Sequence, residues 1–181
     1  AGIGHTRWAT HGEPSDINSH PHSGKRVTIV HNGIIENYKP LKDFLLAQGR
    51  TFQSETDTEV VAQLLDYYYD GNPLDTIIKV MHELEGSFAL GIVFSDHVDK
   101  VYAVRCESPL IVGVGENESF VASDVPAFLK YTRNYYLLDH NEIVELSHDG
   151  IKIYDTHKKE VHKDLKTADW DMDAAEKGGY E

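Results

Sequence analysis

The stretch VTIVHNG, residues 27–33, gives the clearest fold signal in this chain of 181 residues. Its first five residues are mostly β-branched, and the run is short enough for a strand buried in a sheet. Asn-Gly is the strongest turn dipeptide, so the sequence predicts that the strand ends sharply at Asn32-Gly33. Before it, residues 10–24 are rich in His, Pro, Ser, Gly and Asn, and we expect a long irregular loop of the kind that often carries function.

Helices are expected after this strand, followed by a run of further strands. Apolar residues at helical spacing predict helices at residues 41–48, directly after residues 54–57, and at about residues 74–84. Beyond Gly86, runs separated by Asp, Asn and Gly turns predict strands at residues 87–95, 100–106, 110–114, 119–122, 135–138, 143–146 and 151–154. Their close spacing favours antiparallel hairpins, so the predicted fold class is α+β.

Length and composition indicate one domain and argue against several classes of partner. We expect the domain to cover residues 1–162, because residues 163–181 are acidic, poor in aliphatics and typical of a tail or linker. The chain has 17 Lys and Arg against 30 Asp and Glu, a net charge of −13 that argues against nucleic acid and anionic membranes. The longest apolar stretch, residues 88–94, is too short to span a bilayer and no signal layout opens the chain, so we expect a cytoplasmic protein.

The segment at residues 6–12, TRWATHG, is the first of three that look built for a site. A planar Arg such as Arg7 is the preferred group for binding a carboxylate through two parallel hydrogen bonds. An Arg that merely covers apolar surface is the competing interpretation. Trp8, judged by residue type alone, belongs more often to a core than to a site.

Asn32 and Gly33 form the second candidate. At the end of a buried strand, an Asn side-chain amide and the following Gly N–H can point at one spot and stabilise a developing oxyanion. Taken alone, the dipeptide favours a plain β-turn. The third candidate is Asp57, within SETDTE at residues 54–59, which can cap the following helix or bind a ligand ammonium group.

Taken together, these segments resemble one family closely. The strings HTRWATHGEPS, HPH, HNGIIEN and SETDTEV stand at residues 5–15, 20–22, 31–37 and 54–60. In this order and at about this spacing they are similar to the glutaminase domain of glutamine-dependent fructose-6-phosphate aminotransferase, a class II glutamine amidotransferase also called glucosamine-6-phosphate synthase. The similarity extends through residues 85–89, 108–110 and 122–124 and so covers nearly the whole chain.

The resemblance implies an N-terminal nucleophile hydrolase, with two antiparallel sheets packed face to face between helical layers. It implies hydrolysis of glutamine to glutamate and ammonia, which a sugar isomerase domain uses to make glucosamine 6-phosphate in hexosamine biosynthesis. Carried onto this sequence, Asn32 and Gly33 form the oxyanion hole, Arg7 binds the substrate α-carboxylate and Asp57 binds the α-ammonium. Thr10 and His11 line the pocket, and Trp8 lies where ammonia leaves.

The family's nucleophile is an N-terminal Cys whose own α-amine acts as the base, and this sequence opens at a later point of the family pattern. We therefore expect the natural protein to continue upstream, and residues 1–181 alone to be inactive. Cys106, the single cysteine, lies within a predicted strand and has no free α-amine, so we interpret it as a core residue.

A non-catalytic glutamine-binding module that has lost its nucleophile is the alternative function. Missing strands would leave open sheet edges, so we expect a homo-oligomer.

Histidines suggest a metal site as the remaining alternative, above all His5, His11, His20, His22 and His31. A zinc site needs three or four convergent ligands, and His20-Pro21-His22 supplies two at a suitable spacing. Because the resemblance already gives roles to part of this set, we expect neither a metal nor another cofactor.

Overall fold

The computed structural model describes residues 1–169, which form two antiparallel β-sheets and three α-helices. The six-stranded sheet has the order β1 (His22–Ser23), β2 (Val27–Ile35), β3 (Gly86–Phe94), β4 (Val101–Cys106), β8 (Glu142–Ser147) and β9 (Gly150–Tyr154). The four-stranded sheet has the order β10 (Lys166–Thr167), β7 (Asn134–Leu137), β5 (Ile111–Val114) and β6 (Ser119–Ala122). Sheets and helices together confirm the predicted α+β class, and the seven strands predicted after Gly86 are all present.

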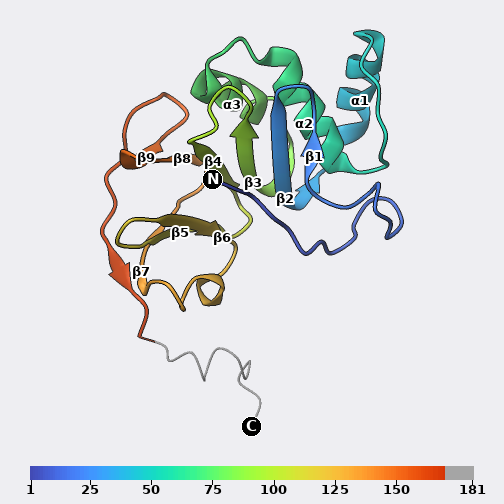
Figure 1. Cartoon of the computed structure of the whole chain (residues 1–181). Coiled ribbons are helices and arrows are strands. Elements are labelled where there is room, and N and C mark those ends of the chain that lie inside the picture. Colours follow the sequence, from blue (N-terminus) through green and yellow to red (C-terminus); the bar gives the residue numbers. More distant parts are fainter. Residues whose placement is uncertain (170–181) are drawn as a thin grey trace.

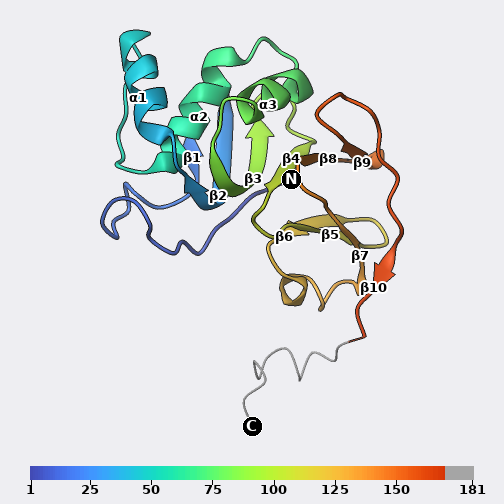
Figure 2. The same ribbon diagram turned by 180° about the vertical axis from the view of Figure 1, so that it is seen from behind.

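Three helices cover the six-stranded sheet: α1 (Tyr38–Ala47), α2 (Asp57–Tyr68) and α3 (Pro73–Met81) (Figure 1). Side-chain oxygens cap two of them, because Thr56 accepts a hydrogen bond from the Glu59 N–H and Asn72 accepts one from the Asp75 N–H. Seen from behind, the four-stranded sheet lies away from these helices (Figure 2). Within residues 1–169 the four-stranded sheet is accompanied only by the 3-10 helix η1 (Val125–Ala127). The α-helices of the described residues therefore all lie on the side of the six-stranded sheet.

Alternating side chains divide the interior into apolar layers. One layer packs the helices against the six-stranded sheet and includes Ile29 and Ile92, both with no exposed surface. A second layer lies between the two sheets and includes Ala103 and Val112. The side chains of β5 show the alternation, because Val112 belongs to the layer between the sheets whereas Ile111 packs on the other face with η1.

The predicted strand end at Asn32-Gly33 is wrong. β2 continues to Ile35 and keeps its register with β3, pairing Asn32 with Ala89 and Gly33 with Phe88. The reason is that Gly33, with φ of 124°, allows a close approach between strands instead of a turn. A Cβ there would overlap the Ser87 carbonyl oxygen and lie 2.8 Å from Ser108 Oγ. The plain β-turn is therefore excluded as the explanation of this dipeptide.

The two ends of the chain take irregular paths. Residues 1–21 contain no helix or strand, and they loop out beside β1 and β2, as expected for the His- and Pro-rich segment (Figure 1). At the other end, β10 pairs with β7 and Ala168 is buried, so residues beyond 162 still contact the four-stranded sheet. Residues 170–181 of the expected linker lie outside the described residues. In the part of the chain from 1 to 169, no helix is long and apolar enough to cross a membrane.

Candidate active site

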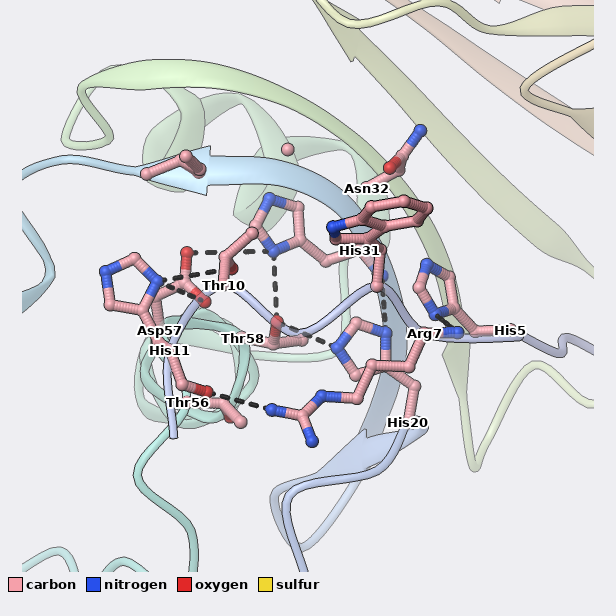
Figure 3. Close-up of a pocket in the computed structure, with 13 residues that line it drawn as sticks. His5, Arg7, Thr10, His11, His20, His31, Asn32, Thr56, Asp57 and Thr58 are labelled. Carbon is pink, nitrogen blue, oxygen red and sulfur yellow. Dashed lines mark hydrogen bonds and ion pairs between the residues drawn. The ribbon is translucent and has the colours of Figure 1, made fainter. Parts of the chain in front are cut away.

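A cavity of about 240 Å³ lies where the N-terminal loop, β2 and the start of α2 meet (Figure 3). It is lined by all seven side chains and backbone groups proposed from the sequence: Arg7, Trp8, Thr10, His11, Asn32, Gly33 and Asp57. The other lining residues are His5, His20, His31, Ile34, Thr56 and Thr58. Three segments within residues 5–58, the N-terminal loop, β2 and the start of α2, thus converge on this cavity.

Arg7 is half-buried and is held by the loop that follows it. Its guanidinium donates to the carbonyl oxygens of His11 at 2.9 Å, Gly12 at 3.2 Å and Glu13 at 3.1 Å. Its backbone has φ of 45°, an unusual value for a residue with a side chain, and its N–H donates to His5 Nδ1 at 2.8 Å. Within residues 1–169 the guanidinium forms no ion pair, so a carboxylate of the chain does not neutralise its charge.

Trp8 is 91% exposed, so the core interpretation of this residue is wrong. The neighbouring Thr10 and His11 lie closer to the helix, where His11 Nδ1 is 3.3 Å from Thr10 Oγ1 and 3.6 Å from Asp57 Oδ1. The His11 ring also packs edge-on against Tyr38, with 4.8 Å between ring centroids. The loop therefore reaches the cavity through polar side chains, and leaves its one large aromatic group facing solvent.

Asp57 is 2% exposed and is the first residue of α2. The capping role considered for it belongs to Thr56, which precedes it. Asp57 Oδ2 instead accepts a hydrogen bond from the Ile35 N–H at 2.9 Å, a contact that joins the end of β2 to the start of α2. The N-terminus of a helix favours a negative charge, so the position suits an acidic side chain.

Four histidines, His5, His20, His22 and His31, gather beside this carboxylate. The rings of His5 and His20 lie 4.2 Å apart, and those of His20 and His22 lie 5.2 Å apart. Burial, reinforced by the neighbouring His5, lowers the pKa of His20 to about 3. Burial also lowers the pKa of His31 to about 4, although the Asp57 carboxylate acts in the opposite direction. The cluster is therefore neutral at neutral pH.

Asn32 and His31 lie on opposite faces of β2, because successive side chains of a strand alternate. His31 is buried toward α2, whereas Asn32 is exposed. In the close-up the Asn32 amide points away from the Asp57 carboxylate, at the other end of the group of labelled side chains (Figure 3). A ligand that contacts both residues therefore has to extend along the cavity.

Sequence reasoning missed Thr56 and Thr58 as lining residues and considered His5 and His20 only as metal ligands. Among residues 1–169 no three or more His, Cys, Asp or Glu side chains are arranged to hold a metal ion. Both threonines lie next to Asp57 within the segment of residues 54–59, and that position could have drawn attention to them.

Cys106 lies at the end of β4 and does not line the cavity. Its thiol is half-buried, 3.7 Å from the Gly86 carbonyl oxygen, and burial raises its pKa. A raised pKa leaves little thiolate at neutral pH, so Cys106 has the properties of a structural residue.

Known proteins are similar to this chain in sequence and in fold. Residues 5–130 match the family model described as a glutamine amidotransferase domain. The chain is 56% identical over 182 residues to the glutamine–fructose-6-phosphate aminotransferase [isomerizing] of Caldanaerobacter subterraneus subsp. tengcongensis, covering 99% of this chain and 30% of that protein. The protein of the same name from Thermus thermophilus is 46% identical over 181 residues, with the same two coverages. The chain thus spans less than a third of the length of these relatives.

A solved structure has a similar fold. Glutamine phosphoribosylpyrophosphate (PRPP) amidotransferase from B. subtilis, complexed with ADP and GMP, superimposes with a TM-score of 0.71 at 25% identity. The match covers 84% of this chain and 34% of that one. The family model, with the fold and the converging site segments, shows that the chain belongs to the glutamine amidotransferase domain family.

Proposed function

We propose that this chain forms the glutamine site of an amidotransferase domain that hydrolyses glutamine to glutamate and ammonia. The observation that carries the proposal is that one cavity is lined by the guanidinium of Arg7, the buried carboxylate of Asp57 and the Asn32-Gly33 pair. Glutamine is a zwitterion with a reactive amide at its far end, so its site needs one cation, one anion and one set of oxyanion donors. The cavity supplies this set.

Each group then has a distinct role. Arg7 binds the α-carboxylate with a charge that no carboxylate of the described residues neutralises. Asp57 binds the α-ammonium, and Thr10 and His11 close the pocket beside it. The Asn32 side-chain amide and the Gly33 N–H donate to the oxyanion that forms when the amide carbon is attacked. Exposed Trp8 lies where ammonia leaves.

The proposal assigns the attack to an N-terminal cysteine, as the family resemblance implies, because Cys106 lies outside the cavity with a raised pKa. The thiolate bonds to the amide carbon, and collapse of the oxyanion breaks the C–N bond. The α-amine returns the proton to the leaving nitrogen, which departs as ammonia. Water then hydrolyses the thioester to glutamate and regenerates the thiol.

The names of the relatives suggest what uses the ammonia. We propose that a sugar isomerase domain combines it with fructose 6-phosphate to form glucosamine 6-phosphate, in a cytoplasmic homo-oligomer. Two named aminotransferases that align with 99% of this chain support this acceptor. Their additional length leaves room for the second domain.

The test measures glutamate release by the complete gene product that contains residues 1–181. Loss of one oxyanion donor in Asn32→Ala lowers kcat by about 10²–10³-fold, while KM for glutamine changes little. Asn117→Ala is the matched control, because Asn117 is exposed in the turn between β5 and β6, outside the cavity. Equal turnover by Asn32→Ala and the control would remove Asn32 from the site, and glutamate release abolished by Cys106→Ala would show that the nucleophile is misassigned.

A further inference from the structure

Thr58 occupies a position between two histidine rings of the cavity wall. Its Oγ1 lies 3.0 Å from His31 Nδ1 and 3.1 Å from His20 Nε2, as the dashed lines in Figure 3 show. Thr58 is 1% exposed, and His31 is 4% exposed. A hydroxyl has one proton and two lone pairs, so where it bridges the two rings it donates to one of them and accepts from the other.

A third contact determines the direction of this chain of hydrogen bonds. The backbone N–H of His31 points at His20 Nδ1 across 3.5 Å, and a backbone N–H can only donate. His20 Nδ1 is therefore the acceptor, and the neutral ring carries its proton on Nε2. His20 Nε2–H then donates to Thr58 Oγ1, and Thr58 donates to His31 Nδ1. The opposite direction would place two N–H groups face to face.

This direction determines what His31 presents to Asp57. His31 Nδ1 lies 4.0 Å from Asp57 Oδ2, close enough for a proton on Nδ1 to be attracted to the carboxylate. When His31 Nδ1 accepts a hydrogen bond from Thr58, this nitrogen carries no proton that could be attracted to Asp57. The proton of the neutral His31 ring is then on Nε2. His31 Nε2 is the one buried side-chain nitrogen or oxygen of the described residues without a hydrogen-bond partner, so in this tautomer its N–H is an unpaired buried donor, a cost that the hydrogen bond from Thr58 has to offset.

Burial favours the neutral form of His31 and outweighs the Asp57 carboxylate, which acts in the opposite direction. Nearly all of the groups around His31 that can carry charge are cationic when protonated, and Asp57 is the acid among them. From the N-terminal loop, from β1 and the residues before it, and from α2, these groups are His5, Arg7, His11, His20, His22 and Asp57. A histidinium formed here would pair with Asp57 and leave that carboxylate less available to a cation that enters the cavity.

We propose that Thr58 is a positioning residue whose hydroxyl holds His20 and His31 neutral with their protons on Nε2, so that Asp57 keeps its negative charge for the cation that enters the cavity. The identity of that cation, the α-ammonium of glutamine, rests on the proposed function. The tautomers do not, because they follow from contacts among residues of this chain.

The experiment combines NMR and kinetics on the complete gene product labelled with 15N-histidine. Long-range 1H–15N spectra of the wild type are expected to show His20 and His31 as Nε2–H tautomers. In Thr58→Val, which keeps the shape and removes the hydroxyl, His31 gains the Nδ1–H form and KM for glutamine rises about tenfold, the effect of one lost hydrogen bond, with kcat within about twofold. Thr58→Ser restores the tautomer and the KM.

A matched control separates this role from the general effect of deleting a buried hydroxyl. Thr76 of α3 is 3% exposed and donates to the Asn72 carbonyl oxygen at 2.8 Å, so Thr76→Val removes a comparable hydrogen bond far from the cavity. It is expected to alter neither spectrum nor KM. Wild-type His31 protonated at Nδ1, or a Thr58→Val protein with native tautomers and KM, would overturn the proposal.

Two further outcomes are also informative. If Thr58→Val does not fold, the wild-type spectrum and Thr58→Ser still decide the direction of the chain. If the wild type shows both Nε2–H tautomers but neither binds nor hydrolyses glutamine, the proposed function fails while the proton arrangement stands.

Discussion

Gly33→Ala separates two reasons for a glycine in the middle of a strand. The backbone at Gly33 has φ of 124°, where an L-residue is strained by about 1–3 kcal/mol. The new Cβ would also overlap the Ser87 carbonyl oxygen and lie 2.9 Å from Phe88 Cα, and such overpacking costs a further 1–3 kcal/mol or so. We therefore expect a destabilisation of about 4 kcal/mol, which lowers Tm by about 8–16 °C in a domain of this size.

Gly150→Ala is the matched control for this experiment. Gly150 has φ of 121°, nearly the same strain, but nothing lies within 4 Å of an added Cβ. Thermal unfolding followed by circular dichroism is expected to show a fall in Tm of about 4–8 °C for Gly150→Ala, from roughly 2 kcal/mol of strain alone. Equal falls in the two variants would refute the reasoning, because they would show that the contact with β3 contributes nothing.

Two further predictions concern charge. The folded-state pKa of His31, about 4, lies below its ordinary value of 6.5, so the unfolded chain binds this proton first on acidification. The free energy of unfolding is therefore undiminished above pH 6.5 and falls by up to about 3 kcal/mol between pH 6.5 and 4. Urea denaturation across this pH range measures the loss. An equal loss in His31→Gln would contradict the assignment of this effect to the His31 ring. Asp57→Asn removes the buried negative charge but keeps an acceptor for the Ile35 N–H. We expect KM for glutamine to rise at least tenfold with little change in Tm, and unchanged steady-state kinetics would exclude Asp57 from the substrate site.

Sequence patterns predicted most elements of the fold because most are decided locally. The apolar spacing of α2 and the turn residues between β3 and β9 are visible in the sequence, and the ends of the strands from β3 to β9 lie within one residue of those expected. The short strands β1 and β10 were missed because two residues carry no periodicity of their own, and β10 in addition pairs with a strand about thirty residues earlier in the chain. Gly33 shows the limit of prediction from local sequence. A glycine is required there because β3, more than fifty residues away in the chain, lies against it.

The site shows the same division. Residue types suggested Arg7, Asn32-Gly33 and Asp57, and the family resemblance added Trp8, Thr10 and His11. Neither could reveal that the Arg7 guanidinium already binds the carbonyl oxygens of residues 11–13. Nor could they assign the helix cap to Thr56 and the β2 contact to Asp57, because both residues suit either role by type. The role of Thr58 depends on three distances that only the folded chain defines.

The order of strands in the larger sheet has a consequence for how the chain folds as it is synthesised. β4 ends at Cys106 and its partner β8 begins at Glu142, with the hairpin of β5 and β6 and then β7 made in between. One edge of β4 therefore stays unpaired while these segments leave the ribosome, and an open apolar edge can pair with other nascent chains. The cavity is built from residues 5–58 and does not wait for this closure. Aggregation during expression should therefore depend on how quickly β8 arrives, so slower synthesis after residue 106 will lower the yield of folded protein.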